Sequence, residues 1–468
     1  MTSRKHATRT FSGDPPRSLW WDTLDEPVTA RAPLGGDTEA DVAIVGAGYT
    51  GLWTAHYLSK ADPKLRIVVL EQAVAGFGAS GRNGGWCSAL FATSYGRIAE
   101  EHGVEAALAM HRAMCDAVDE VGKASAELGI DCHYAKGGTV SAARTRAQLE
   151  RARDEVASLR ELGVGEEDIR LASAQEARQE LGATDVLGAV VNPNCAAVHP
   201  ARLVRGLASA VERNSVKLYE STPAIAVEQH RVVTGSGTVR AEVVIRATEG
   251  YTGRLKNMGR TVVPIYSLMI ATEPLSRDFW ADAGLARRQT FSDMRHLVIY
   301  GQRTADDRIA FGGRGAPYHF RSAIDPAFDQ DHNVHSAIRT TLVELFPALA
   351  DTEITHTWGG PLGITRDWHP SVGYDARSGL GWAGGYAGDG VSTTNLAGRT
   401  LADLVLGRDT DLVGLPWVGH KSPKWEPEPF RWLGVNAALR LTGSADLAES
   451  RLGRGTKRSA LLERLTGS

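Results

Sequence analysis

The chain has 468 residues, of which 43% are apolar and 23% are charged. These proportions are typical of folded soluble proteins and exclude disordered, fibrous and membrane-spanning chains, while the length predicts two or three domains. The 52 basic and 55 acidic residues leave no basic excess, so nucleic acid is not an expected partner. The four cysteines lack C-x-x-C spacing, and no window approaches the run of about 18 apolar residues that a membrane helix needs. We therefore expect a cytoplasmic protein with no membrane span.

A dinucleotide-binding motif is predicted near the N-terminus. An apolar, β-branched run at 41–45 leads directly into the glycine motif G-A-G-Y-T-G at 46–51, a helical pattern follows, and a second apolar run at 66–70 ends at Glu71. In this arrangement the glycines let the backbone approach a pyrophosphate, the helix N-terminus stabilises its charge, and the acid accepts hydrogen bonds from a ribose. The segment therefore predicts binding of NAD or FAD.

Two further glycine-rich segments favour FAD over NAD. The loop G-F-G-A-S-G-R-N-G-G-W at 76–86 stands where an NAD-dependent dehydrogenase normally continues with a plain helix. A long, flexible backbone there suits a cofactor that extends into a ribityl chain and a flat ring. Near the other end, a short strand at 381–383 and the loop G-G-Y-A-G-D-G at 384–390 precede a predicted helix at 391–406. The N-terminus of that helix would stabilise negative charge on a reduced flavin.

These segments resemble the D-amino-acid-oxidase-like family of FAD-dependent amine and amino-acid oxidoreductases, and within it the gamma-glutamylputrescine oxidase-like proteins. The resemblance extends over residues 18–440. It implies an α/β fold with a discontinuous Rossmann-like FAD-binding domain and an α+β substrate-binding domain over the flavin. The motifs that carry it are S-L-W-W at 18–21, D-V-A-I-V-G-A-G-Y-T-G-L at 41–52, G-F-G-A-S-G-R-N-G-G at 76–85, H-P-A-R-L-V-R-G-L at 199–207, P-I-Y-S-L-M-I-A-T-E-P-L at 264–275, F-G-G-R at 311–314, W-G-G-P-L-G-I-T-R-D at 358–367 and G-G-Y-A-G-D-G-V at 384–391.

The expected domain boundaries follow from that fold. Residues 1–37 form an N-terminal arm, and residues 411–468 form a C-terminal packing extension. The parts of the two expected domains are 38–95, 190–260 and 355–410 for the FAD-binding domain, and 96–189 and 261–354 for the substrate-binding domain.

The resemblance also implies which residues hold FAD. The first glycine motif and the acid would bind the ADP half, the second loop would line the pyrophosphate and the flavin edge, and the C-terminal loop would complete the cradle. The expected cofactor-binding residues are Gly46, Gly48, Tyr49, Thr50, Gly51, Glu71, Gln72, Gly78, Ala79, Ser80, Arg82, Asn83, Gly84, Gly85, Ala224, Thr248, Gly250, Gly363, Gly385, Gly388, Asp389, Gly390 and Val391.

Three features depart from the family pattern. The loop at 76–85 has no His and the stretch before Gly384 has no Cys, which are the residue types that tether flavin covalently in some relatives, so we expect noncovalent FAD. Gly360 stands where relatives that act on simple amino acids have the arginine of a G-x-R-P pattern. Because a bidentate guanidinium–carboxylate contact is hard to replace, an amine or an elongated amino compound is favoured as the substrate. The third departure is T-E-G-Y at 248–251 together with Asp389, whose side chain we expect at a ribityl hydroxyl.

Strands at 262–271 and around 296–314 are predicted to form a sheet above the flavin. Aromatic rings there would suit an ammonium substrate because ring faces attract cations, but alternation along a strand turns about half of its side chains into the core. The sequence identifies no catalytic residue and predicts no metal site. The candidates for the substrate pocket are Trp86, Tyr266, Tyr300, Arg314, Trp358 and Tyr386.

The predicted function is that of a FAD-dependent amine or amino-acid oxidoreductase, either an oxidase or a dehydrogenase. A small-molecule amine would pass a hydride from its α-carbon to the flavin, the imine would hydrolyse, and oxygen or another carrier would accept the electrons. Two alternatives remain open. The G-D-G at 388–390 before a helix also resembles a motif of flavin-dependent hydroxylases, and the missing arginine is compatible with a noncatalytic FAD-binding regulator.

Overall fold

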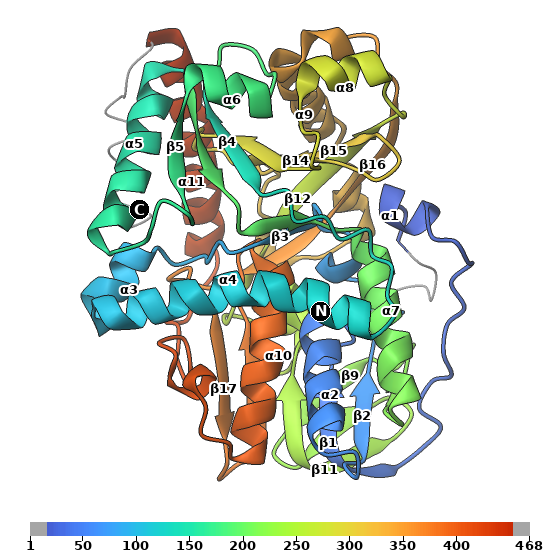
Figure 1. The fold of residues 1–468 in the computed structure, drawn as a ribbon. Helices are drawn as coiled ribbons and strands as arrows, with labels where there is room; N and C mark the ends of the chain where they lie inside the picture. The colour runs from blue at the N-terminus through green and yellow to red at the C-terminus, as the bar shows by residue number, and fades with distance from the viewer. Residues whose placement is uncertain (1–15, 453–468) are drawn as a thin grey trace.

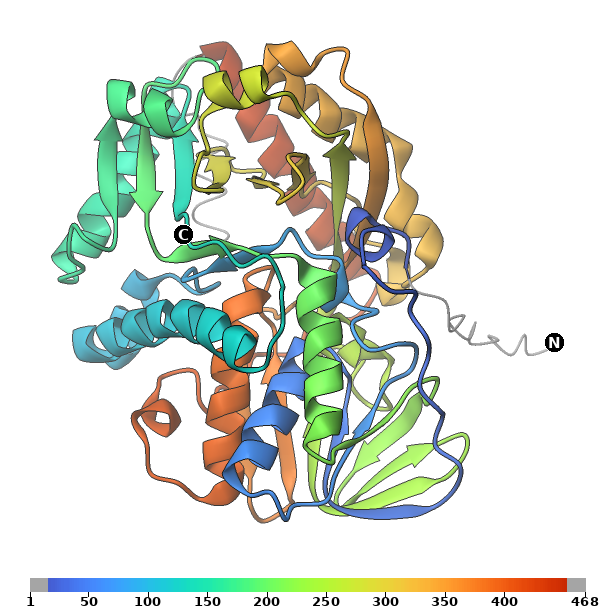
Figure 2. The same cartoon turned by 45° about the vertical axis from the view of Figure 1, so that its right-hand side comes forward.

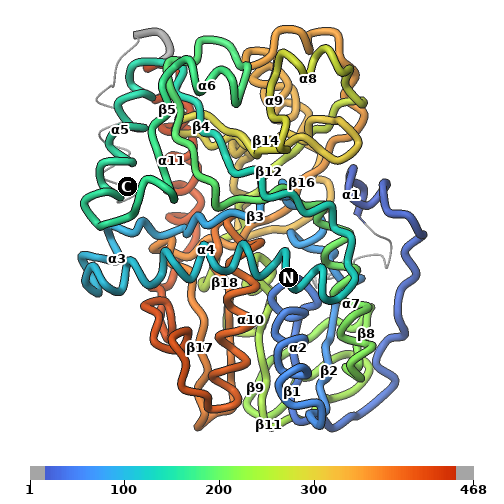
Figure 3. The backbone as a smooth tube through the Cα atoms, viewed as in Figure 1, coloured from blue at the N-terminus to red at the C-terminus, as the bar shows by residue number. Residues whose placement is uncertain are grey.

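The computed structural model describes residues 16–452, which form two lobes stacked on one another (Figure 1). Each lobe is built on a sheet of eight strands. The smooth trace in Figure 3 shows the chain passing between the lobes several times, so that each lobe is assembled from separate stretches of sequence. A small two-stranded sheet of β3 (Trp86–Ser88) and β7 (Cys195–Ala197) lies where the lobes meet.

The lower lobe of Figure 1 contains a sheet with a parallel centre. Its strands are β1 (Thr38–Val45), β2 (Ile67–Leu70), β8 (Lys217–Tyr219), β9 (Ala224–Glu228), β10 (Arg231–Thr234), β11 (Thr238–Arg246), β17 (Ser371–Asp375) and β18 (Leu380–Gly384). The order is β17-β18-β11-β1-β2-β8, with β9 and β10 attached beside β11. The central strands β1, β2, β8, β11 and β18 pair in parallel. Their long apolar runs are typical of parallel strands, because both faces of such a sheet are covered.

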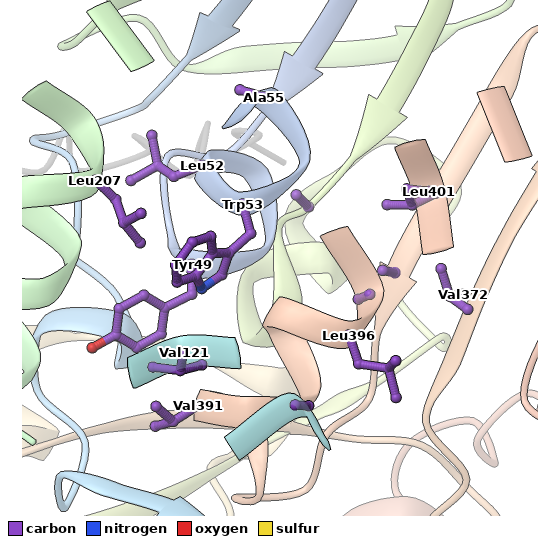
Figure 4. Close-up of a cluster of buried hydrophobic side chains, with 14 of the residues drawn as sticks. Tyr49, Leu52, Trp53, Ala55, Val121, Leu207, Val372, Val391, Leu396 and Leu401 are labelled. Carbon is purple, nitrogen blue, oxygen red and sulfur yellow. The ribbon is translucent and has the colours of Figure 1, made fainter. Parts of the chain in front are cut away.

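The side chains of β1 alternate between two cores. Val42 and Ile44 pack beneath a layer of helices, whereas Ala43 and Val45 pack on the opposite face toward β10. The helices of this layer are α2 (Tyr49–Ala61), α4 (Val104–Glu127), α7 (Pro200–Arg213) and α10 (Gly390–Leu406). Figure 4 shows the helix-side core, to which α2 contributes Tyr49, Leu52 and Trp53 and α10 contributes Leu396 and Leu401.

The upper lobe contains a second, mostly antiparallel sheet in the order β16-β12-β15-β14-β13-β4-β6-β5 when its strands are named as in Figure 1. The bounds in that order are Ile354–Ile364, Val263–Thr272, Ile309–Gly313, Ile299–Arg303, Thr290–Asp293, Thr139–Ala143, Gly188–Asn192 and Arg170–Ser173. β13 and β4 pair in parallel, and this pairing joins two parts of the sheet that are far apart in sequence. The helices of the lobe are α5 (Arg146–Glu161), α6 (Ala174–Glu180), α8 (Arg277–Ala283) and α9 (His332–Leu345).

The expected domain boundaries differ from the observed sheets in three places. β16 pairs with β12 along its whole length, so residues 355–364 extend the second sheet instead of the first. β6 also belongs to the second sheet, although residues from 190 onward were expected in the FAD-binding domain. Conversely, α4 buries its apolar stripe against the helices of the first lobe. A helical stripe or an apolar strand in a sequence shows that a face is buried, but it does not show which neighbour covers it.

The N-terminal arm is fixed to both lobes. Its short helix α1 (Leu19–Asp22) buries Trp20 and Trp21 in a cluster with Trp358 of the upper lobe. Figure 2 shows the following segment running down the outside of the lower lobe to β1. There the guanidinium of Arg31 binds the buried carboxylate of Glu220 at 3.0 Å.

The described part of the C-terminal extension contains helix α11 (Phe430–Leu452), which crosses behind the upper sheet in Figure 1. The carboxylate of Asp446 accepts hydrogen bonds from the backbone N–H groups of His296 and Leu297, both at 2.8 Å. Glu449 binds the guanidinium of Arg151 at 2.9 Å. Among residues 16–452, no helix is long and apolar enough to cross a membrane.

Candidate functional site

A cavity of about 530 Å³ opens at the carboxyl ends of β1 and β2, the position at which α/β sheets bind ligands. The glycine motif makes this edge accessible. Gly46 adopts a φ of +109°, and a Cβ there would clash with the carbonyl oxygen of Ala247. A Cβ on Gly51 would clash with the Gly46 carbonyl, so this glycine lets α2 pack closely on β1. The N-terminus of α2 therefore points its backbone N–H groups toward the cavity.

Glu71 follows β2 and lines the same cavity. Its two carboxylate oxygens accept hydrogen bonds from the backbone N–H groups of Ala47 (2.9 Å) and Ala73 (3.0 Å). Burial nevertheless raises the pKa of Glu71 to about 7. Each oxygen keeps a second lone pair, so the carboxylate can still accept a hydroxyl donor from a ligand in the cavity.

The second glycine loop is held by its own side chains. Asn83 donates to the carbonyls of Ala79 and Ser80, both at 3.1 Å, and accepts from the N–H of Gly85 at 2.7 Å. The hydroxyl of Ser80 accepts the N–H of Tyr49 at 2.9 Å, which links this loop to the first turn of α2. The loop is therefore fixed in position against the glycine motif.

The guanidinium of Arg82 is buried and engaged on several sides. It forms an ion pair with Asp329 at 2.7 Å and donates to the carbonyls of Gly78 and Gly359 and to the Tyr251 hydroxyl. Burial raises the pKa of Asp329 to about 6, although the neighbouring guanidinium lowers it. Arg82 thus ties the loop to the upper lobe.

A partly buried carboxylate, for which the sequence analysis gave no role, closes the other side of the cavity. Glu249 lines the cavity and accepts the backbone N–H groups of Gly363 (2.7 Å) and Tyr386 (3.2 Å). Burial raises its pKa to about 7. Its φ of 38° places it in the left-handed region, and it joins the segment after β11 to β16 and to the loop before α10.

Most of the expected cofactor residues lie on this cavity, and the others lie behind it. Those on the cavity wall are Gly46, Gly48, Tyr49, Thr50, Glu71, Gln72, Gly78, Ala79, Ser80, Asn83, Ala224, Thr248, Gly250, Gly388, Gly390 and Val391. Those outside this lining are Gly51, Arg82, Gly84, Gly85, Gly363, Gly385 and Asp389. Several of this second group act as spacers, since a Cβ on Gly84 would stand 2.6 Å from the ring of Tyr300 and one on Gly385 would stand 2.7 Å from Thr365.

Further cavity residues were missed by the sequence analysis. Most of them come from segments without a glycine signature, whereas Pro361 and Leu362 lie between the glycines of the motif at 358–367 but gave no sign of their own position. They include Ser221, Pro223, Ile225, Arg254, Leu255, Pro361, Leu362 and Thr394, besides Glu249.

The cavity fits FAD. It extends from Glu71, which suits a ribose, past the N-termini of α2 and α10, which suit a pyrophosphate and a reduced ring, to Leu362 and Tyr386. Glycines lie on both sides of this path, where a Cβ would narrow it. The residues within 16–452 that line the cavity include no His or Cys, the residue types that tether flavin covalently in some relatives.

The six candidates for the substrate pocket lie in different places, some next to the cavity and others in the hydrophobic core. Tyr300 and Trp86 meet edge to face with ring centroids 6.3 Å apart, and the Tyr300 hydroxyl lies 2.7 Å from Ser267 Oγ. Both rings lie beside the second glycine loop. Tyr386 lines the FAD cavity itself and bonds to Thr50 at 2.9 Å. These contacts place the three aromatic residues around the region between the lobes.

Tyr266 differs from its expected position. It alternates with Ser267 along β12, so its side chain lies on the opposite face, in the core beneath α9. There its ring meets Phe328 edge to face with centroids 5.8 Å apart. Trp358 is also buried, packed against Trp20 with its indole N–H donating to the Arg82 carbonyl at 2.8 Å. Both side chains therefore belong to the hydrophobic core next to the pocket.

Arg314 lies at the end of β15, above the C-terminal loop. Its Nη2 donates to the Ala387 carbonyl at 2.6 Å and would lie 3.0 Å from a Cβ on Gly388. The guanidinium carbon lies 5.6 Å from the ring centroid of Trp368. Asp389 is close enough for Arg314 to lower its pKa, but burial has the larger effect and raises that pKa to about 6.

Comparison with known proteins gives consistent matches. The model of the DAO family, described as FAD dependent oxidoreductase, matches residues 41–404. Gamma-glutamylputrescine oxidoreductase of Escherichia coli is 29% identical over 411 residues, which cover 86% of this chain and 90% of that protein. The probable oxidoreductase OrdL of Rhizobium meliloti is 31% identical over 408 residues, which cover 85% of this chain and 90% of that protein.

Solved structures match the fold. Glycine oxidase from Geobacillus kaustophilus superposes with a TM-score of 0.69 at 22% identity, covering 82% of this chain and 99% of that one. L-proline dehydrogenase from P. horikoshii superposes with a TM-score of 0.66 at 20% identity, covering 81% and 96% of the two chains. At these identities the likeness concerns the fold alone.

Proposed function

Because this chain belongs to the DAO family of FAD-dependent oxidoreductases, we propose that it oxidises the C–N bond of an amine or an elongated amino compound. Bound FAD supplies the two-electron acceptor for the substrate's α-C–H bond, and the resulting imine hydrolyses in water. The chain itself binds the cofactor, orients the substrate between the lobes and excludes water. The electron acceptor that follows is oxygen or another carrier, and the free, mostly buried cysteines agree with a cytoplasmic location.

The observation that carries this proposal is the continuous cavity from Glu71 to Leu362, bordered by two helix N-termini and roofed by the second sheet. Glu71 would hold the ribose of the ADP half, and the N-terminus of α2 would hold the pyrophosphate. The N-terminus of α10, beside Gly388 and Gly390, would stabilise negative charge where a reduced ring is held.

The proposal that the substrate is an amine, and not a simple amino acid, depends on Gly360 in β16. Gly360 has no side chain to bind an α-carboxylate at this strand, and the space beside it is occupied by the guanidinium of Arg82. The Escherichia coli relative is named for gamma-glutamylputrescine, a compound whose terminal primary amine is remote from its α-carboxylate. We propose a substrate of this general kind.

The test is an anaerobic titration of the purified FAD-bound protein with primary amines, gamma-glutamyl amines, aminophosphonates and amino acids, followed by flavin absorbance. Bleaching by an amine and not by glycine or D-alanine supports the proposal. No bleaching by any compound contradicts it. Consumption of NADPH would then indicate a hydroxylase, and inertness toward both would indicate a regulator.

A further inference from the structure

Two arginines lie near the cofactor cavity, Arg82 in the second glycine loop and Arg314 directly after β15, and they differ in how many of their N–H donors are already used. Arg82 is 5% exposed, and its guanidinium contacts Asp329, Gly359, Gly78 and Tyr251. Four of these contacts use N–H donors of a group that has only five. Arg82 therefore has little capacity left for a ligand.

Arg314 is the opposite case. Within residues 16–452 its side chain makes one hydrogen bond, to the Ala387 carbonyl, and no ion pair. It is partly exposed, and its guanidinium carbon lies over the ring of Trp368, 5.6 Å from the ring centroid, which favours the cation at this place. Four of its five N–H donors therefore have no hydrogen-bond partner among residues 16–452.

The position of Arg314 brings those donors to the cofactor. Its Nη2 lies beside Gly388, which lines the FAD cavity together with Leu362. It is also near enough to Tyr300 to influence that hydroxyl. A ligand group bound at Arg314 would thus be held above the C-terminal loop, at the edge of the cavity that Gly388 lines.

We propose that Arg314 binds an anionic group of the substrate, a carboxylate, and so replaces the contact that Gly360 cannot make. This inference rests on the proposed amine oxidation and narrows its substrate to an amine that also carries a carboxylate. The planar fork of the guanidinium matches two carboxylate oxygens. Asp389, whose pKa Arg314 lowers, does not form an ion pair with it within 4.0 Å, so Arg314 remains able to attract an anion of the substrate.

The test uses butyrate and butyramide as probes, which differ only in charge and have no amine to be oxidised. Each is titrated into the FAD-bound protein at constant ionic strength while the visible spectrum of the oxidised flavin is recorded. We expect butyrate to perturb the spectrum and its Kd to rise about tenfold or more in Arg314→Gln, with partial recovery in Arg314→Lys. Butyramide should bind equally weakly to all forms.

The matched control is Arg366→Gln. Arg366 also lies over a tryptophan, Trp425 at 5.4 Å, but it pairs with Glu426 at the surface. Its substitution should leave the Kd of butyrate unchanged. Failure of wild-type protein to bind butyrate, or an equal Kd in Arg314→Gln, overturns the inference.

A second pair of compounds separates this inference from the proposed function. The rate of anaerobic flavin reduction is measured with 4-aminobutyrate and with butylamine. Faster reduction by 4-aminobutyrate that is lost in Arg314→Gln supports the inference. Equal reduction by both amines overturns it and leaves amine oxidation standing, whereas butyrate binding that depends on Arg314 without reduction by any amine of the wider panel supports the anion site and refutes the proposed function.

Discussion

The guanidinium carbon of Arg82 lies 3.2 Å from the point that a Cβ on Gly360 would occupy. The two residues therefore share one space at the junction of the lobes: the loop provides the arginine, and β16 provides the glycine that makes room for it. Asp329 fixes the arrangement because its carboxylate is the counter-ion of a guanidinium whose side chain is 4% exposed.

Removing that counter-ion should be costly. Asp329→Asn leaves the Arg82 charge buried and unpaired, and such changes typically destabilise a protein by about 3–5 kcal/mol. Since Asp329 retains 18% exposure, we expect about 2–3 kcal/mol, measured as the free energy of unfolding in urea. Glu127→Gln is the matched control, because the Lys60–Glu127 pair is about half exposed and its loss should change the free energy of unfolding much less. Equal effects of the two substitutions would contradict this account.

A substitution in the glycine motif should weaken the binding of FAD. Gly46→Ala would place a methyl group against the Ala247 carbonyl at a φ of +109°, so the turn between β1 and α2 must shift. We expect purified Gly46→Ala to hold less than about a tenth of the wild-type FAD, a loss of more than ~1.4 kcal/mol in binding, measured from the ratio of absorbance at 450 and 280 nm. Gly96→Ala is the control, since no atom lies within 4 Å of the added carbon. Full FAD occupancy in Gly46→Ala would count against the cofactor site.

The cofactor cradle was predictable because its residues carry a local signature. At Gly46 and Gly51 the backbone approaches other backbone so closely that no other residue fits, and this requirement is visible as spacing in the sequence. The parallel pairing of β1 with β2 follows from the same pattern, because the right-handed connection through α2 allows few alternatives.

The substrate side was less predictable because its geometry depends on tertiary pairing. Tyr266 and Ser267 are neighbours in sequence, yet only the register of β12 decides that Ser267 meets Tyr300 and Tyr266 enters the core. Glu249 stood out only as part of the departure T-E-G-Y at 248–251, and its role gave no signal because its partners Gly363 and Tyr386 are more than a hundred residues away. The contacts of Asp446 and Glu449 in α11 likewise join segments that are far apart in the sequence, so no local pattern indicates them.

The affinity for FAD should depend on pH through Glu71. Its pKa is raised to about 7, and the ionised carboxylate is the stronger acceptor for a ribose hydroxyl. A ligand that favours the ionised form binds more tightly as pH rises, so the Kd of FAD should fall by up to about tenfold between pH 6 and pH 8. Glu71→Gln should weaken binding at pH 8 and flatten this dependence, whereas Asp41→Asn, at the exposed start of the apolar run, should not. A Kd that rises with pH in the wild type would refute the role of Glu71.

Glu249 should make the free energy of unfolding of the apoprotein fall as pH rises. Because burial raises its pKa from 4.5 to about 7, its contribution to stability is fully present below pH 4.5 and is lost as pH rises through 7. Glu249→Gln cannot ionise, so its stability relative to wild type should improve between pH 5 and pH 8, by on the order of 1 kcal/mol. Urea unfolding at the two pH values measures this difference. The exposed Glu242→Gln should show no such trend, and a relative loss of stability for Glu249→Gln at pH 8 would contradict the assignment.

Helix α11 should depend on Asp446 for its attachment to the upper lobe. Both carboxylate oxygens of Asp446 accept backbone N–H groups at the turn before β14, from His296 and Leu297 at 2.8 Å each. Asp446→Ala leaves both donors without this partner, at a cost of about 1–3 kcal/mol for each donor that water does not reach. Because the loss is local, we expect faster amide hydrogen exchange in α11 and around β14 with little change in α2 or β1. Arg440→Ala, on an exposed part of the same helix, is the control for helix propensity, and equal protection in wild type and Asp446→Ala would show that apolar packing alone holds the helix.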